Sequence, residues 1–465
     1  MPRTKPKVPL PVVLILVSFL CPTEFSLYIA GLRLPPHRLA LLLLFPIAIA
    51  RLVVSPDQRI RGFDILFILY GLWTFGVYGM HSGQEGFVYG GSLALEALGG
   101  YFVARAFVRT TDQLRATMRA SILAIVAAML IALPETLLGQ IFTHDLLRQI
   151  TGYHHPIGIE TRLGLTRAYG TFDHPIHYGT FCAALLALFW YAENRATNRK
   201  INAGTLTFAT FLGLSSAPML CLGLQGGMLV WERVTRSIKA RMALTMTALA
   251  GIYIAMSLLS NRSPIAFIAT GMTLDPWTGF YRLQIWDAGL ENVWGSPWTG
   301  IGLAAWERPW WMISDTVDAF WLVTGMRQGI PAFLLLALAI IVLARSVLKQ
   351  RWRHADGQAQ KIAMGWMMSL IALSLVGATV HYWNVLHTFF FFFIGLGAWI
   401  ADPSRAALAS FGASTRAANQ PRTMTRRNPN PNEPLFGRPY GTQRPGNTRW
   451  QPAQTHYGRP YGLAP

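Results

Sequence analysis

The sequence predicts an all-α polytopic membrane protein with about 12 transmembrane helices and a large periplasmic loop that contains interfacial helices. Of its 465 residues, 52% are hydrophobic and only 13% are charged, roughly half the charged share of soluble domains. The apolar residues stand in long blocks rather than at the spacing of an amphipathic helix or a strand. Together with the charge distribution described below, these observations exclude a disordered chain, a disulfide scaffold and a soluble enzyme as the main interpretation.

Candidate transmembrane segments follow from the apolar blocks in order, because a helix needs roughly 20 mostly apolar residues to cross a bilayer. A short basic stretch from Met1 to Lys7 precedes the first block, which has no good cleavage site and is predicted to remain as a helix. A break at Leu214–Pro218 divides the seventh block from the eighth, so this pair could also be one long helix with a re-entrant piece. The segments centre on residues 10–30, 38–54, 63–80, 87–107, 118–139, 171–191, 202–217, 218–232, 242–259, 317–344, 362–380 and 385–401.

The blocks and the connections between them divide the chain into six parts. Two outer connections are too long to be simple loops, and long loops of this kind tend to carry function. The parts are residues 1–139 with the amino-terminal transmembrane helices, 140–170 as a first long periplasmic loop, 171–259 with the central helices, 260–316 as a large periplasmic catalytic loop, 317–401 with the carboxy-terminal helices, and 402–465 as a disordered cytoplasmic tail.

The positive charges fit this topology when both termini are placed in the cytoplasm. The cytoplasmic side then holds 31 of the 40 lysines and arginines, 22 of them in the loops and 9 in the tail. This is the bias expected of a polytopic membrane protein. The net charge of +19 is therefore mostly a topology signal, and a nucleic-acid partner is not predicted.

The carboxy-terminal tail and the cysteines carry little information on function. The tail is rich in Pro, Asn, Arg and Gly and contains a near-repeat, Gly437–Gly441 and Gly458–Gly462. Such a composition buries too little apolar surface to fold, so disorder is favoured over a docking motif. The cysteines are Cys21, Cys182 and Cys221, all in apolar segments, and they indicate neither a disulfide framework nor a metal site.

The large outer loop is rich in tryptophan. Eight of the chain's 16 tryptophans lie between Trp277 and Trp321. They form either an interfacial aromatic belt or a surface that stacks on sugar rings, and the two interpretations are compatible. Residues 280–294 within this loop predict a helix whose apolar stripe lies in the outer membrane interface, with Arg282 at the edge of the stripe, at the depth of a lipid phosphate.

The end of the first outer loop collects polar side chains before a predicted helix. Asp173 is placed to cap that helix, and Pro175 suits its first turn. His174 and His177 are three residues apart and share a face. A metal site is less favoured than a polar or substrate-orienting role, because no HExxH or matching Cys and His set exists. No Asp-x-Asp pair, P-loop or GxSxG motif occurs, so neither a metal nor another cofactor is predicted.

Five short motifs resemble, in their order, the O-antigen ligase and Wzy-type polysaccharide polymerase superfamily. The similarity covers most of the membrane region and is strongest at residues 160–335. The motifs are Arg167-x-x-Gly170-Thr171-Phe172-x-His174-Pro175, Arg282-x-x-x-Trp286, Ser296-Pro297-Trp298-x-Gly300-Ile301-Gly302, Val317-Asp318-x-Phe320-Trp321-Leu322 and Arg327-x-Gly329-Ile330.

The resemblance implies a metal-independent glycosyltransferase of the GT-C type at the outer face of the bacterial inner membrane. Such enzymes move a glycan from an undecaprenyl-diphosphate carrier to an acceptor hydroxyl, and their arginines bind the diphosphate. By motif position these are Arg167 and Arg282, with Arg327 as a third candidate. Guanidinium groups suit this task because they form bidentate, charge-assisted hydrogen bonds to phosphate. The further predicted substrate-binding residues are His174, Asp173, Trp286, Trp298 and Trp321.

Asp318 separates the two activities within the superfamily. Ligases resemble one another in a histidine near this place, whereas Asp318 resembles the polymerase-like members. Its carboxylate could act as the base for the acceptor hydroxyl or could be a simple partner of Arg327. Polar residues inside the membrane are further candidates. Among them, Glu96 is predicted to pair with a neighbouring helix rather than to take part in catalysis.

The leading prediction is an inner-membrane polymerase of undecaprenyl-diphosphate-linked oligosaccharide repeats, which makes an exopolysaccharide or an O-antigen. Asp318, Arg282 and Arg167 are its predicted catalytic residues. Its partners would be the lipid-linked glycan, membrane lipids and other polysaccharide assembly proteins. The alternatives are a ligase that transfers finished glycan to lipid A core or another acceptor, and a flippase for the same lipid. The flippase is less favoured because no paired broken helices are visible.

Overall fold

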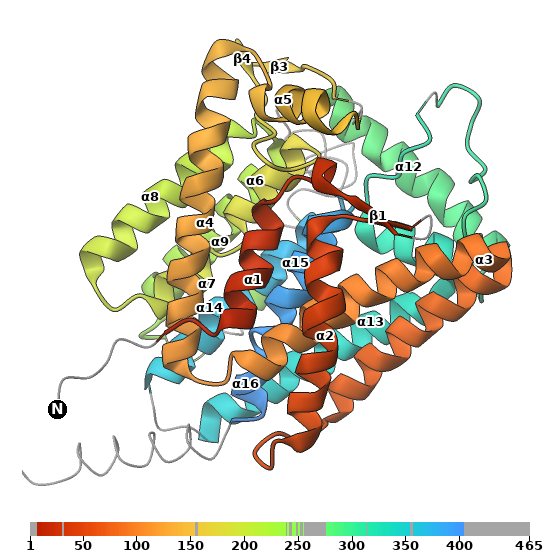
Figure 1. The fold of residues 1–465 in the computed structure, drawn as a ribbon. Coiled ribbons are helices and arrows are strands. Elements are labelled where there is room, and N and C mark those ends of the chain that lie inside the picture. The colour runs from red at the N-terminus through yellow and green to blue at the C-terminus, as the bar shows by residue number, and fades with distance from the viewer. Residues whose placement is uncertain are drawn as a thin grey trace, which may run out of the picture. The chain divides into compact units, whose positions relative to one another are not determined.

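The computed structural model describes residues 7–29, 32–153, 157–238, 240, 244–247, 250–251, 254, 276–312, 314–353 and 357–403. These residues are mostly helical, and the strands among them form two small antiparallel sheets (Figure 1). Strand β1 (Leu27–Ile29) pairs with β2 (Leu32–Leu34), and β3 (Thr161–Arg162) pairs with β4 (Leu165–Thr166). The predicted tail lies almost entirely outside the described residues.

Seven helical segments in the described part of the chain are long and apolar enough to cross a membrane, which indicates a membrane protein. The shorter apolar helix α1 (Leu10–Leu20) precedes them. The predicted number of 12 spans is not confirmed, and the predicted segment 242–259 lies mostly outside the described residues. The seven are α2 (Pro36–Val54), α3 (Gly62–Phe107), α4 (Thr111–Leu138), α6 with α7 (Pro175–Ala183 and Leu186–Ala192), α13 (Phe320–Arg353), α14 (Gly357–Val376) and α15 with α16 (Asn384–Gly395 and Ala398–Ala401).

Helix α3 is a hairpin of two antiparallel helical halves (Figure 1). The chain reverses at Ser82 and Gly83, where Gly83 has a φ of 54°. Near the open ends of the hairpin, the Asp64 carboxylate accepts hydrogen bonds from the Tyr101 hydroxyl at 2.5 Å and from Arg105 Nε at 3.2 Å. The two segments predicted at 63–80 and 87–107 are therefore both helical, and they pack on each other directly.

The first predicted segment is wrong in length. It was expected over residues 10–30, but α1 ends at Leu20. Pro22 follows after one residue, and proline cannot donate the backbone hydrogen bond that would continue a helix. The chain then forms the short 3₁₀ helix η1 (Thr23–Phe25) and the β1–β2 hairpin.

The predicted segments 202–217 and 218–232 form two separate helices, α8 (Ala196–Leu212) and α9 (Ser216–Thr235). Leu214 between them has a φ of 41°, a left-handed conformation that a helix cannot contain. One continuous helix is therefore excluded. Neither α8 nor α9 is among the seven segments that satisfy the length and hydropathy criteria.

Helix α15 lies at the centre of the bundle and is almost completely buried. Its run of five phenylalanines, Phe389 to Phe393, packs against aromatic rings of α1, α3 and α6. The Phe19 ring, for example, meets the Phe389 and Phe392 rings edge-on at centroid distances of 6.0 and 5.9 Å. Edge-to-face pairs of this kind stabilise a core beyond the burial of their area.

Helix α13 has an interior kink that receives the turn at residues 296–302. Gly329 at the kink has a φ of 82°, and a Cβ atom there would lie 2.1 Å from the Trp298 carbonyl oxygen, so only glycine fits. Across the kink, the Ile301 amide donates to the Met326 carbonyl at 2.9 Å and the Ile330 amide donates to the Pro297 carbonyl at 2.8 Å.

Glu96 joins three helices inside the bundle. Its fully buried carboxylate accepts a hydrogen bond from Arg38 Nε at 2.7 Å and lies 3.1 Å from both His37 Nε2 and His387 Nδ1. The pairing predicted for this residue is confirmed. Because a charge in a low-dielectric interior must be compensated, the cluster ties α2 and α15 to α3.

We expect Glu96→Gln to lower the midpoint of thermal unfolding strongly, because Arg38 would lose its carboxylate partner. Breaking a buried ion pair from one side costs about 3–5 kcal/mol. The measurement is the unfolding midpoint of purified protein in detergent. Glu85→Gln, an exposed position on the same helix, is the matched control. Equal midpoints for the two variants would contradict a stabilising role of the cluster.

Candidate functional site

Four segments that are distant in sequence line one polar cavity of about 340 Å³. They are the β3–β4 hairpin with the chain that leads into α6, the start of α9, helix α12 (Pro276–Gly295) and the residues just before α13. The cavity brings together four predicted site residues, Arg167, His174, Arg282 and Asp318. Its other lining residues are Glu160, Arg162, Ile176, Ser215, Ser216, Ala217 and Thr278.

Arg167 is held rigidly at the wall of this cavity. It directly follows β4, and only 3% of its surface is exposed. Its guanidinium forms an ion pair with Glu160 and donates a hydrogen bond from Nη2 to Ser215 Oγ at 2.7 Å. The β3–β4 hairpin therefore places a fixed positive charge beside the first turn of α9.

Glu135 supports the loop that carries Arg167. One oxygen of its buried carboxylate accepts backbone hydrogen bonds from Tyr169 at 3.0 Å and from Gly170 at 2.8 Å. Gly170 has a φ of 60°, which lets the chain turn sharply after the arginine. Glu135 thus lies outside the cavity lining and positions the loop from α4.

Arg282 is the cation with the fewest protein partners at the site. It projects from α12 into the cavity, its Nε is buried, and this atom has no hydrogen-bond partner within the described part of the chain. Burial lowers the pKa of Arg282, Asp318 opposes this shift, and the nearby Arg162 and Arg167 add to it. An arginine stays protonated even so, so the cavity holds a positive charge whose hydrogen-bonding capacity is partly unused.

The amino terminus of α9 also faces the cavity. Ser215 is its N-cap, Ser216 and Ala217 are its first residues, and all three line the cavity. The first backbone N–H groups of a helix have no partner within it and carry the positive end of its dipole. Together with Arg162, Arg167 and Arg282, this helix end creates a site suited to an anion such as a phosphate group.

Asp318 contributes a carboxylate to the same cavity. Burial raises the pKa of Asp318, and the charge of Arg282 opposes this increase. The alternative in which Asp318 simply pairs with Arg327 is not supported, because Arg327 Nη1 donates to the carbonyl oxygens of Gly302 at 2.8 Å and Ala304 at 3.3 Å. A carboxylate with a raised pKa beside an anion site is a suitable general base.

His174 presents its ring to the cavity from the start of α6. The helix begins at Pro175, as expected, but its N-cap is His174, whose Nδ1 accepts a hydrogen bond from the Ile176 amide at 3.1 Å. The prediction that Asp173 caps this helix is therefore wrong. Because Nδ1 accepts, the neutral ring carries its proton on Nε2.

Asp173 has a different structural environment from the one predicted. One oxygen accepts from the Thr23 hydroxyl at 2.6 Å and the other accepts from Asn384 Nδ2 at 2.7 Å. It does not line the cavity. Its contacts join the segment after α1 to the start of α15, beside the elements that carry the site.

The other predicted substrate-binding residues lie outside the cavity lining. Arg327 binds the turn at residues 302–304, as described above. The indole N–H groups of Trp286 and Trp321 donate to the carbonyls of Ala378 at 2.8 Å and Ser374 at 2.7 Å. Trp298 is 75% exposed. For these side chains a role in binding sugar remains a prediction.

Helix α12 itself matches the helix predicted for residues 280–294. Ile285, Ala288 and Val293 are buried on the side that packs against α13. Leu290 and Trp294, which belong to the predicted apolar stripe, are exposed. The two histidines considered for a metal site, His174 and His177, lie with ring centroids 6.2 Å apart.

Several cavity residues were missed in the sequence. Arg162, Glu160 and Thr278 carry no signal of their own. Ser215 and Ser216 do carry one, because two serines followed closely by proline are typical of a helix start. This signal was missed, because the same stretch is also typical of a break between two apolar segments.

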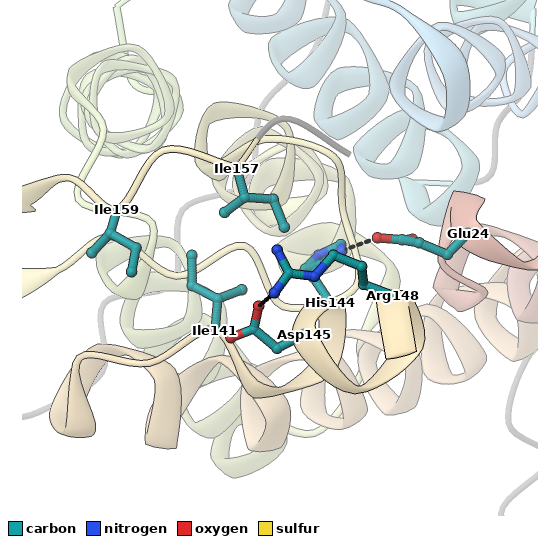
Figure 2. Close-up of a pocket in the computed structure, with 7 residues that line it drawn as sticks. All are labelled: Glu24, Ile141, His144, Asp145, Arg148, Ile157 and Ile159. Atoms are coloured by element: carbon teal, nitrogen blue, oxygen red, sulfur yellow. Dashed lines mark hydrogen bonds and ion pairs between the residues drawn. The ribbon is translucent and has the colours of Figure 1, made fainter. Parts of the chain in front are cut away.

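A second, smaller cavity of about 180 Å³ lies beside helix α5 (Phe142–Thr151) and η1 (Figure 2). Figure 2 shows the His144 ring directed toward the Glu24 carboxylate and Arg148 beside Asp145. His144 and Glu24 are buried, and His144 Nδ1 is hydrogen-bonded to Glu24 Oε1. Burial lowers the pKa of His144, but the hydrogen bond and the charge of Glu24 stabilise the protonated ring and raise this pKa above its ordinary value. Glu135 and Asp173 add smaller effects in the same direction.

The His144–Glu24 pair predicts a pH dependence of stability. A raised folded-state pKa means that the stabilisation is fully present below the ordinary histidine value of 6.5. It is lost as the pH rises through the higher folded-state value. The unfolding midpoint should therefore fall over that interval in the wild type, and the fall should be smaller in Glu24→Gln. Identical pH profiles for the two proteins would contradict this assignment.

A comparison of the chain with models of protein families gives no match, and a comparison with curated proteins gives none either.

Proposed function

We propose that the protein is a metal-independent membrane glycosyltransferase that polymerises undecaprenyl-diphosphate-linked oligosaccharide repeats into an exopolysaccharide or an O-antigen. The single observation that carries the proposal is the cavity in which Arg162, Arg167 and Arg282 meet the start of α9 and the Asp318 carboxylate. The ordered motifs of the sequence support the same superfamily. In this proposal the diphosphate lies among the arginines.

The proposed reaction uses the two kinds of charge in the cavity separately. The acceptor hydroxyl oxygen forms a new bond to the anomeric carbon of the donor sugar, while the bond from that carbon to the diphosphate oxygen breaks. The diphosphate leaves with the bonding electron pair, and the arginines stabilise its charge. The proton of the acceptor hydroxyl moves to Asp318. His174 would orient the substrate from the start of α6.

The proposed topology has 12 spans, cytoplasmic termini and an active site that faces the periplasm. The antiparallel halves of α3 support this topology, because they allow α3 to cross the membrane twice. The position of α12 and of the residues before α13 at the cavity supports a functional role for the large loop at 260–316. The distribution of lysine and arginine supports the orientation.

The experiment that tests the proposed function is a polymerisation assay with purified full-length protein in detergent. The substrate is an undecaprenyl-diphosphate-linked repeat, EDTA is present, and the products are separated on a gel. A ladder of products that is resistant to EDTA is expected. A single transfer to an added acceptor without a ladder would favour a ligase, and bound but unchanged lipid would favour a flippase.

A further inference from the structure

A large open groove lies at the opposite end of α9 from the arginine cavity. Its volume is about 980 Å³, and it is formed by α7, α8, α9 and the start of α14. Ser216 at the first cavity and Arg233 at this groove are 17 residues apart on one helix, which corresponds to about 26 Å. The groove and the cavity therefore lie near opposite ends of α9. In the proposed topology, in which α9 crosses a hydrocarbon core about 30 Å thick, they face opposite membrane surfaces.

Polarity changes in the same direction along each helix that forms the groove. On α8, Arg199 at the end is followed inward by Ala203 and Thr207 at intervals of four residues, which places all three on one face. On α9, Arg233 is at the end and Gly226 lies deeper. The groove therefore has a cationic rim and a deeper wall of small and apolar side chains.

The rim has an excess of positive charge. Four cations line the groove against two carboxylates, and both carboxylates already accept protein hydrogen bonds. Glu232 accepts from the Tyr191 hydroxyl at 3.1 Å, and Glu193 accepts from the Arg195 amide at 3.0 Å. The cations are Arg199, Arg233, Arg236 and Lys361.

Arg199 is preorganised to face an anion at this rim. Its Nη2 donates to the Glu193 carbonyl at 3.1 Å, and its guanidinium lies 5.4 Å from the centre of the Trp190 ring. Its Nε is buried and has no hydrogen-bond partner among the described residues. Arg233 forms no ion pair within the same part of the chain. Neither guanidinium charge is therefore neutralised by a carboxylate within the described residues, which favours a phosphate group at the rim.

We propose that this groove binds one anionic glycerophospholipid of the membrane leaflet opposite the arginine cavity. The phosphate lies among the rim cations, and an acyl chain runs along α8 and α9 toward Thr207 and Gly226. Thr207 lies eight residues after Arg199 on α8, a distance of about 12 Å along the helix, which is close to the roughly 15 Å depth of one hydrocarbon leaflet. A soluble phosphate would use the rim but would leave the apolar wall unoccupied. This inference does not depend on the proposed enzymatic function.

The test is native mass spectrometry of the full-length protein in detergent. The probes are dioleoyl phosphatidylglycerol, dioleoyl phosphatidylcholine and free glycerol 3-phosphate. We expect one phosphatidylglycerol to be retained at concentrations where phosphatidylcholine is not. Displacement of that lipid by equimolar glycerol 3-phosphate would overturn the proposal in favour of a soluble-anion site.

Two pairs of variants locate the lipid. Arg233→Gln combined with Lys361→Gln should weaken retention about 10-fold or more, because each cation near a membrane surface contributes to anionic lipid binding. The matched control neutralises Arg345 and Lys349, two exposed cations of α13 that do not line the groove. Equal loss of lipid in the two double variants would mean that the attraction is general, and it would overturn a specific site.

Gly226→Phe tests the deeper wall. A Cβ atom at Gly226 meets no other atom within 4 Å, and the same holds for the neighbouring Gly227, which does not line the groove. Both substitutions should therefore fold. Gly226→Phe should obstruct the deeper wall of the groove and strongly weaken retention of phosphatidylglycerol, whereas Gly227→Phe should retain it. Full retention in Gly226→Phe would exclude an acyl chain at this position.

Discussion

Arg282→Gln is expected to abolish the product ladder while leaving the protein folded. Its guanidinium is the least engaged cation of the cavity, and in the proposed reaction it stabilises the charge on the leaving diphosphate. Removing one such preorganised donor costs about 10²–10³-fold in kcat, or about 2.7–4 kcal/mol. Glutamine keeps much of the size and polarity of the side chain, so a loss of rate would result from the removal of the positive charge. The measurement is the initial rate of chain lengthening at saturating lipid-linked repeat.

The control for Arg282 is Arg148→Gln. Arg148 lies on α5, is about half exposed and pairs with Asp145 one turn away, so it tests whether removing any surface arginine has the same effect. Arg148→Gln should retain nearly the wild-type rate. If Arg282→Gln lengthens chains at the wild-type rate, the cavity is not the catalytic diphosphate site, and the proposed function loses its main support.

Asp318→Asn is expected to lower kcat by about 10²–10⁴-fold, the usual contribution of a positioned general base. Binding of the lipid-linked repeat should persist, because the arginines are unchanged. The dependence of the wild-type rate on pH provides a second test of Asp318 as the base. Burial raises the pKa of Asp318 above its ordinary value of 3.8, and the base acts only when it is ionised. The rate should therefore rise with pH over a range higher than that of an ordinary aspartate, and the variant should lack this rise.

The control for Asp318 is Asp315→Asn, three residues earlier in an exposed position that does not line the cavity. Its rate and pH profile should match the wild type. An Asp318→Asn protein with an unchanged rate would exclude the proposed base and leave the arginine cavity as a binding site. A rate loss accompanied by equal loss of lipid binding would instead assign Asp318 a structural role.

The helices could be predicted from sequence where apolar runs are long. The segments around α2 and α4 follow directly from such runs, because burial of the backbone in lipid demands helices. Prediction failed where one residue or a few residues determine where a helix ends or a strand forms. Pro22 ends α1 ten residues early, and β1 with three residues is too short to give a pattern. Whether two apolar runs form one helix or two at Leu214 depends on a single backbone conformation.

The sequence by itself determined the class of the protein and the identity of its charged candidates. Apolar runs, the bias of lysine and arginine, and ordered motifs that include Arg167, Arg282 and Asp318 are all local properties of the chain. They require no knowledge of which segments touch.

Only the tertiary structure decided which of these side chains share a cavity. Arg167 donates a hydrogen bond to Ser215, which is 48 residues away in the sequence. Asp173 instead accepts hydrogen bonds from Thr23 and Asn384. Arg327 donates to the carbonyl oxygen of Gly302. The physical reason is that a buried polar group must find a partner, and the packing of the helices determines which partner is within reach. A cation with unused donors, such as Arg282, is visible only after all the other partners have been assigned.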